Sequence, residues 1–172
     1  MRWIPSRNLH LTLKFLGDVE NRRVPELCSA VQRAAEALEC DPNETNRSDR
    51  SHDENIVAVA AFELAGLGCF PHGGKARVVW AGVRPRGPGV LSCYNALESE
   101  FTELGFVPEA RRFSPHITLA RVRGSGDVAA LRTAVETQDF VGPQQRPSEL
   151  VLFESSPTPS GVEYLALARA PF

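Results

Sequence analysis

His10-Leu11-Thr12-Leu13 recurs in the second half of the chain as His116-Ile117-Thr118-Leu119, and this duplicated stretch decides which fold the sequence predicts. A turn that contains proline precedes each copy, at Pro5 and at Pro115. The copies lie too far apart for a solenoid repeat, so their similarity indicates two halves related by a pseudo-twofold axis. We therefore expect each half to contribute one strand to a shared site.

Each copy of the repeat combines a base with a hydroxyl. Side chains at positions i and i+2 of a strand point to the same side, so histidine and threonine share one face while leucine or isoleucine anchors the other. Two such strands side by side would place two imidazoles at one substrate atom. The hydroxyls of Thr12 and Thr118 could then donate hydrogen bonds to phosphate oxygens, which predicts a phosphodiester site.

Histidine suits proton transfer because its unperturbed pKa of about 6.5 allows one copy to be neutral and the other protonated near neutral pH. The neutral imidazole would deprotonate water, and the imidazolium would protonate the departing ribose oxygen. We therefore predict His10 and His116 as a catalytic pair that requires neither a metal nor another cofactor. His52 and His72 lie outside the repeat, and surface or loop roles are favoured for both.

The hydrophobic pattern predicts alternating strands and helices around the two motifs. Strands are expected at residues 9–16, 56–64, 76–83, 113–122, 149–153 and 163–168, and helices at residues 24–38, 88–104 and, capped by Asp127, 128–136. A turn rich in glycine and proline is expected at residues 66–74. Residues 41–55 contain no hydrophobic side chain that could join a core, which predicts a disordered polar loop. The mixture of elements indicates an α+β fold.

The composition is that of one soluble domain spanning residues 1–172. The net charge of −2 excludes a global basic field, so any contact with RNA must be local. Arginine outnumbers lysine by 17 to 2, which suits forked binding of phosphate but fits a GC-rich genome equally well. The four cysteines lack the C-x-x-C spacing of a zinc ribbon and are expected to be buried, reduced thiols. No apolar run could span a membrane, and we expect a cytoplasmic monomer.

The motif segments NLHLTLKFLG (residues 8–17) and FSPHITLARV (residues 113–122) resemble those of the 2H phosphoesterases, in particular the RNA 2′,3′-cyclic phosphodiesterases, also called 2′-5′ RNA ligases. GLGCFP (residues 66–71) and RVVWAGV (residues 77–83) extend the resemblance, as do residues 152–156 and 161–164 near the end of the chain. The resemblance implies a bilobal α+β fold with two antiparallel sheets lining a central cleft. It also implies hydrolysis of a 2′,3′-cyclic phosphate to a 2′-phosphomonoester, with His10 as proton donor and His116 as proton acceptor.

Phe15 and Arg121 each stand five residues after a motif histidine. By resemblance, Phe15 would stack on the terminal base and Arg121 would bind the phosphate. Strict alternation puts both side chains on the face opposite the histidines, so a bulge or the end of the strand must turn them inward. For Phe15, a place in the core is the alternative. Family members usually carry a strand and a helix ahead of the first motif, and we expect both to be missing here.

Two other functions use the same residues. An ATP-independent 2′-5′ RNA ligase would run the chemistry backwards, whereas a binding module would recognise RNA ends or nucleotides without turnover. Hydrolysis is favoured over ligation because water is abundant and no extended basic surface could hold two RNA ends. Two titrating imidazoles argue against simple binding, for which arginine and threonine suffice. The expected substrates are RNA or oligonucleotide ends with a 2′,3′-cyclic phosphate, or small cyclic nucleotides.

Overall fold

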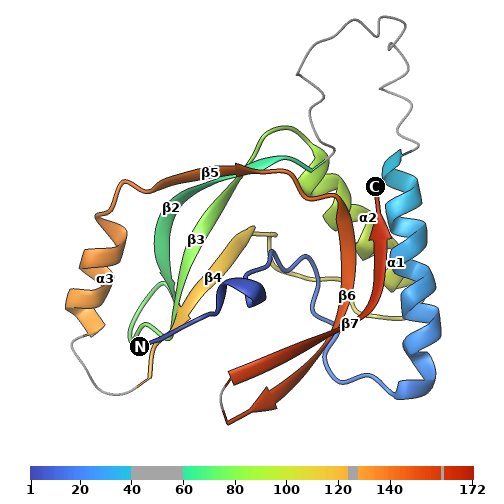
Figure 1. Ribbon diagram of the computed structural model, residues 1–172, viewed down its shortest axis with the longest axis horizontal. Helices are drawn as coiled ribbons and strands as arrows, with labels where there is room; N and C mark the ends of the chain where they lie inside the picture. The colour runs from blue at the N-terminus through green and yellow to red at the C-terminus, as the bar shows by residue number, and fades with distance from the viewer. Residues whose placement is uncertain (40–59, 124–127, 160) are drawn as a thin grey trace, which may run out of the picture. The chain divides into compact units, whose positions relative to one another are not determined.

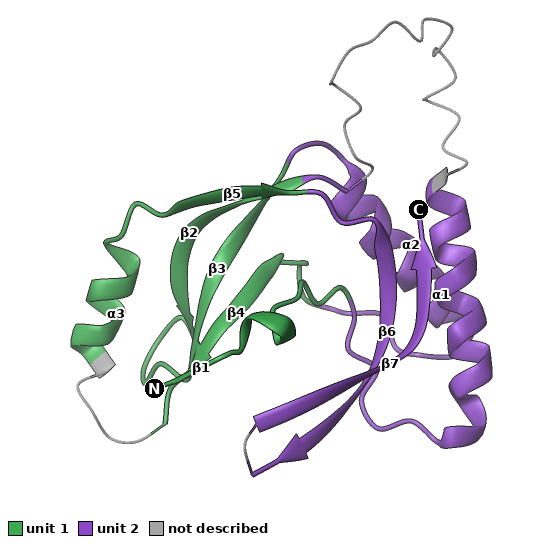
Figure 2. Cartoon of the chain, viewed as in Figure 1, with its two compact units in different colours: residues 1–13, 62–85, 111–145 green, residues 14–61, 86–110, 146–172 purple. Residues whose placement is uncertain are grey.

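A computed structural model describes residues 1–39, 60–123, 128–159 and 161–172 of the chain. The polar segment 41–55 and the predicted cap Asp127 lie outside the described residues. The chain divides into two compact units, shown in Figure 2. Unit 1 comprises Met1–Leu13, Phe62–Pro85 and Arg111–Gln145, and unit 2 comprises Lys14–Ala61, Arg86–Ala110 and Arg146–Phe172.

Unit 1 is built on an antiparallel sheet with the strand order β1-β4-β3-β2-β5. Its strands are β1 (Arg2–Trp3), β2 (Phe62–Phe70), β3 (Val78–Pro85), β4 (His116–Arg121) and β5 (Val141–Gln145). The β3 and β4 strands were predicted from the pattern, with boundaries shifted by a few residues. The short edge strands β1 and β5 were not predicted, because neither shows a period-2 run long enough to be recognised.

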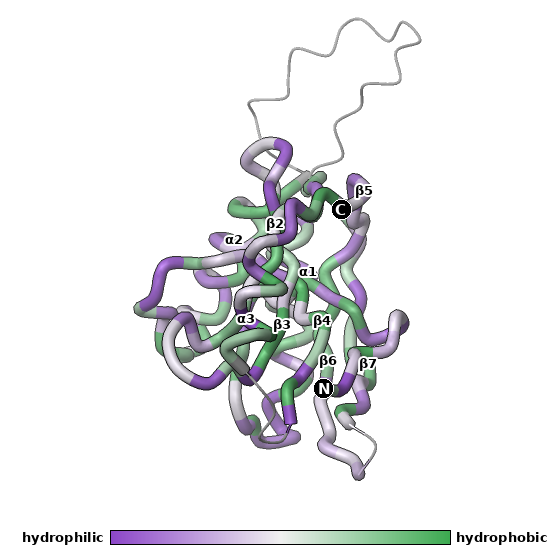
Figure 3. The backbone as a smooth tube through the Cα atoms, turned by 90° about the vertical axis from the view of Figure 1, so that its left-hand side faces the viewer, coloured by the Kyte–Doolittle hydropathy of each residue, from purple (hydrophilic) through white to green (hydrophobic). Residues whose placement is uncertain are grey.

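Helix α3 (Val128–Glu136) contacts β2 and covers one face of this sheet (Figure 1). Hydrophobic residues concentrate along β3 and β4, whereas the turns are mainly hydrophilic (Figure 3). The covered face is small and tightly packed. It is formed by Cys69, Ala76, Val79 and Ala120 of the sheet and its turns, against which Val122, Leu131 and Val135 pack. The other face of the sheet therefore carries the side chains that alternate with these residues.

The predicted strand at residues 56–64 overlaps β2 at residues 62–64, and its residues 56–59 lie outside the described residues. The predicted turn at residues 66–74 is wrong over residues 66–70, because β2 runs from Phe62 to Phe70. Glycine usually weakens a strand, and this is why the sequence pattern favoured a turn. Gly66 has a φ of 73° and lies in a register shift between Leu64 and Leu67, so it forms a bulge within the strand. Gly68 continues the pairing opposite Trp80.

Unit 2 contains α1 (Val24–Glu39), α2 (Gly89–Glu103) and the hairpin of β6 (Glu149–Thr158) and β7 (Gly161–Pro171). Both helices were predicted within two residues at each end, and both hairpin strands are longer than predicted. Helix α1 contacts α2 and both strands (Figure 1). It buries residues at helical spacing, and α2 contributes its own apolar face. The buried side chains are Leu27, Ala30, Val31, Ala34, Ala35 and Leu38 of α1, and Val90, Cys93, Leu97 and Phe101 of α2.

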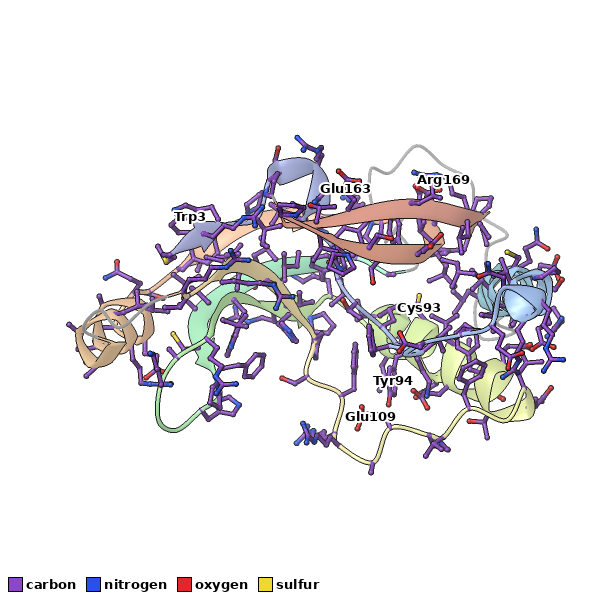
Figure 4. The ribbon with its side chains drawn as sticks, turned by 90° about the horizontal axis from the view of Figure 1, so that it is seen from below. Trp3, Cys93, Tyr94, Glu109, Glu163 and Arg169 are labelled. Atoms are coloured by element: carbon purple, nitrogen blue, oxygen red, sulfur yellow. The ribbon has the colours of Figure 1, made fainter. Side chains whose placement is uncertain are left out.

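The cysteines of the described segments are reduced, as predicted. Cys69 and Cys93 are buried and Cys28 is half-buried, and burial raises the pKa of the Cys93 thiol to about 11. Tyr94 and Glu109 lie close together (Figure 4). Burial raises the pKa of Tyr94, and the carboxylates Glu98 and Glu109 raise it further. Within the described segments, no helix is long and apolar enough to cross a membrane.

Candidate active site

The first motif does not form the strand predicted for residues 9–16. A 3₁₀ turn at Ser6–Asn8 follows β1, and the chain then pairs with β4 through a single antiparallel bridge between Leu11 and Ile117. Two residues later the chain passes from unit 1 into unit 2, where Lys14 binds Glu98. The segment therefore leaves its partner strand before a ladder can form.

The bridge pairs equivalent residues of the two copies of the repeat. Leu11 follows His10 and Ile117 follows His116, so a local twofold axis through the bridge relates one motif to the other. Residues that flank an antiparallel bridge also face each other, which puts His10 across from Thr118 and Thr12 across from His116. The pseudo-twofold relation expected from the repeat thus appears inside unit 1, between two adjacent segments.

Both histidines are held by the same backbone contact. Nδ1 of His10 donates to the carbonyl oxygen of Asn8, and Nδ1 of His116 donates to that of Ser114, each at 2.8 Å. A carbonyl can only accept, so Nδ1 carries the proton in each neutral ring. Nε2 is therefore the nitrogen that gains or loses a proton, and both rings are fixed in the same tautomer.

The His116 ring also packs against one aromatic side chain of β2 and one of β3. Its centroid lies 4.9 Å from that of Phe70, nearly perpendicular to it, and 6.2 Å from that of Trp80. Phe70 and Trp80 are themselves 5.3 Å apart. Edge-to-face packing of this kind restricts the rotation of the imidazole. His116 is therefore oriented by its ring contacts as well as by its hydrogen bond.

Trp80 lies over Gly68 of β2. A Cβ atom added at Gly68 would stand 2.2 Å from Cζ2 of Trp80, and one added at Gly82 would stand 2.4 Å from the carbonyl oxygen of Ala65. Neither position has room for a side chain. This close packing explains why the segments GLGCFP and RVVWAGV contain glycine at these positions inside strands. The sequence pattern alone did not single out Phe70, Trp80 or Gly68 as parts of the site.

A bulge in β4 brings Arg121 to the face that carries the histidines. Consecutive residues Val79 and Trp80 of β3 pair with Ala120 and Thr118, which leaves Leu119 as the extra residue. Val78 then pairs with Arg121. Because paired residues share a face, Arg121 projects from the same side as Trp80 and Thr118. The bulge that strict alternation required for Arg121 is therefore present.

The remaining residues of interest fall outside this cluster. Phe15 belongs to unit 2 and is 80% exposed, so the alternative of a core aromatic is wrong. Lys14 donates to both carboxylate oxygens of Glu98 in unit 2. His72 lies exposed in the turn after β2, as expected, with its ring 5.1 Å from that of Phe70. In the described part of the chain, no group of three or more His, Cys, Asp or Glu side chains could hold a metal ion.

Comparison with known proteins places the chain in a family. The model of the 2′-5′ RNA ligase superfamily matches residues 2–154. The chain belongs to this superfamily. It is 31% identical over 168 residues to the RNA 2′,3′-cyclic phosphodiesterase of Methanothermobacter thermautotrophicus, covering 95% of this chain and 78% of the relative. It is 32% identical over 131 residues to the protein of that name from Aeropyrum pernix, covering 76% of this chain and 62% of the relative.

Solved structures of similar fold support the α+β architecture of this superfamily member. TT0787 of Thermus thermophilus aligns with a TM-score of 0.70 at 23% identity, covering 99% of this chain and 81% of that one. E. coli LigT complexed with 3′-AMP aligns with a TM-score of 0.66 at 24% identity, covering 99% and 80% of the two chains. The family that the motif segments resemble and the predicted α+β fold are both confirmed.

Proposed function

We propose that this protein is an RNA 2′,3′-cyclic phosphodiesterase that hydrolyses the cyclic phosphate at an RNA end to a 2′-phosphomonoester. The observation that carries the proposal is the matched pair of histidines in unit 1, each with Nδ1 hydrogen-bonded to the carbonyl two residues earlier. Identical tautomers related by a local twofold axis suit one proton removal and one proton delivery at a single phosphorus atom. The relatives that carry this enzyme name match most of the chain.

In the proposed reaction, His116 accepts a proton from water at Nε2 while the oxygen of that water attacks phosphorus. The bond from phosphorus to the 3′ oxygen breaks, and His10 donates a proton from Nε2 to that oxygen. The packing of His116 against Phe70 and Trp80 favours the acceptor role for this ring, because an acceptor must point steadily at the attacking water.

The negative charge that develops on the phosphate oxygens must be stabilised by hydrogen-bond donors. Thr118 lies across from His10 and Thr12 across from His116, so their hydroxyls flank the same space as the imidazoles. Arg121, on the same face, adds a positive charge that a phosphate can bind in a forked geometry. Phe15, which is exposed in unit 2, is proposed to stack on the terminal base.

The test is end-group analysis of the product from an oligonucleotide with a 2′,3′-cyclic phosphate, without added metal. We expect a 2′-phosphate from the wild type and loss of turnover in His10→Ala and His116→Ala, with His72→Ala as the control that retains activity. A bell-shaped pH profile of kcat is expected, because one imidazole must be neutral and the other protonated. Equal turnover by His116→Ala and the wild type would refute the mechanism.

Ligation and simple binding are separated by the same assay. A ligase would convert a cyclic phosphate and a 5′-hydroxyl end into a 2′-5′ joined product, which gel mobility distinguishes from a 2′-phosphate. A binding module would retain the oligonucleotide without any change of its end at any pH. Turnover is favoured over simple binding because both imidazoles are held in one tautomer, an arrangement that binding does not need.

A further inference from the structure

Two arginines lie directly opposite each other at the edge of the sheet in unit 1. Arg2 of β1 pairs with Arg121 of β4, and Arg121 pairs on its other side with Val78 of β3. The side chains of Arg2 and Arg121 therefore share the face that carries Thr118 and Trp80. Arg121 is exposed and Arg2 is half-buried.

Like charges directly opposite on neighbouring strands are destabilising. Within residues 1–39, 60–123, 128–159 and 161–172, neither Arg2 nor Arg121 forms an ion pair with a carboxylate. Several other arginines of these segments sit beside glutamate, as Arg84 does beside Glu63. An arginine pair that faces no carboxylate of the described segments is an arrangement that an anion from outside would stabilise.

The arginine pair lies one pleat repeat, or two residues, beyond the row of side chains that contains Thr118. Because Leu119 is the extra residue of the bulge, Arg121 is the next residue after Thr118 on the face that carries the histidines. The row that contains Thr118 and the arginine row are about 7 Å apart along β3. Successive phosphates of a nucleic-acid strand are separated by a comparable step. A strand whose terminal phosphate lies between the histidines would thus bring its preceding phosphate to the arginine row.

We propose that Arg2, together with Arg121, forms a second phosphate site that binds the phosphodiester preceding the cyclic end, so that an oligonucleotide binds more tightly than a cyclic mononucleotide does. This inference rests on the proposed function. Arg121 would face both phosphates, whereas Arg2, which lies one strand farther out, would serve the second phosphate alone.

The test compares a 2′,3′-cyclic mononucleotide with a dinucleotide that ends in the same cyclic nucleotide. We expect Arg2→Ala to lower kcat/KM about tenfold on the dinucleotide, mainly through KM, and to leave the mononucleotide unchanged. For the dinucleotide, the decrease of kcat/KM with rising salt concentration should become less steep in Arg2→Ala, by the amount expected for the loss of about one phosphate contact. Arg77→Ala is the matched control. Arg77 is exposed and directly precedes Val78, the first residue of β3, so its side chain lies on the opposite face of the sheet. Its substitution therefore removes the same charge from the other face.

Two further variants separate binding from folding. Arg2→Lys should partly restore the dinucleotide rate. Arg2→Glu should raise the melting temperature, because an opposite charge then faces Arg121, and should weaken the dinucleotide rate more than Arg2→Ala does. An equal loss on both substrates, or no loss on either, would overturn the proposal, as would a lower melting temperature in Arg2→Glu.

The second phosphate site and the enzymatic function can be tested independently of each other. If the wild type opens neither cyclic substrate, the enzymatic function fails, and binding of a dinucleotide 3′-phosphate by fluorescence anisotropy then decides the second site. Weaker binding by Arg2→Ala than by Arg77→Ala would support the site even in an inactive protein. Equal binding by the two variants would overturn it.

Discussion

Leu11 and Ile117 form an antiparallel bridge between the two copies of the histidine-threonine repeat. This one contact sets the local twofold relation of the site, because it pairs equivalent positions of segments that are far apart in the sequence. Each motif therefore presents its histidine to the threonine of the other. The following predictions depend on this arrangement and on the packing that holds it.

Removing either threonine hydroxyl should slow the chemical step. Thr12→Val and Thr118→Val keep the size of the side chain but delete a donor to the phosphate oxygens, and kcat is expected to fall about 100-fold with little change in KM. Steady-state kinetics on a cyclic-phosphate substrate measures the effect. Thr133→Val, on the exposed side of α3, should behave as the wild type. Unchanged kcat in Thr118→Val would show that this hydroxyl does not contact the reacting group.

Gly68→Ala should disturb the site through Trp80. The added Cβ would lie 2.2 Å from Cζ2 of Trp80, so the indole must move away from its place beside His116. Overpacking of this kind costs roughly 1–3 kcal/mol of unfolding free energy. Denaturant unfolding and kcat should both be affected. Gly73→Ala, where no atom lies within 4 Å of the added Cβ, is the matched control and should change neither.

Glu98→Gln should destabilise unit 2 by leaving Lys14 without its counter-charge. Nζ of Lys14 lies 2.7 and 2.9 Å from the two carboxylate oxygens, and the side chains are only 6% and 15% exposed. Removing one partner from such a pair costs roughly 3 kcal/mol. The comparison is Glu20→Gln, whose partner Arg22 is 83% exposed and for which about 0.5 kcal/mol or less is expected. Similar losses in both variants, measured by urea unfolding, would contradict the prediction.

Stability should fall at alkaline pH because of Cys93. Its pKa is about 11 in the folded protein and 9.0 is the ordinary value, so the unfolded chain loses the thiol proton first as the pH rises. The stability contributed by the neutral thiol is complete below pH 9 and is lost towards pH 11, by roughly 2–3 kcal/mol in total. Unfolding free energies of the wild type and Cys93→Ala at pH 8 and pH 10.5 measure this term. The wild type should lose more stability than the variant between these values, and parallel losses would exclude Cys93 as the cause.

The sequence by itself was sufficient to predict the fold class and most of the elements. The repeated histidine and threonine are visible as a pattern, and helices α1, α2 and α3 follow from helical spacing and from their terminal residues. These features are local, since each depends on residues close together in the chain. The family and the α+β class followed from the same local signals.

Only the tertiary structure decided how the two motifs meet. Alternation predicted a full strand around His10, but departure of the chain into unit 2 leaves only the bridge at Leu11. The extra residue Leu119 turns Arg121 to the histidine face, and Gly68 accommodates the indole of Trp80. Register, bulges and packing against distant residues depend on which strands become neighbours, and a periodic pattern within one segment carries no information on that choice.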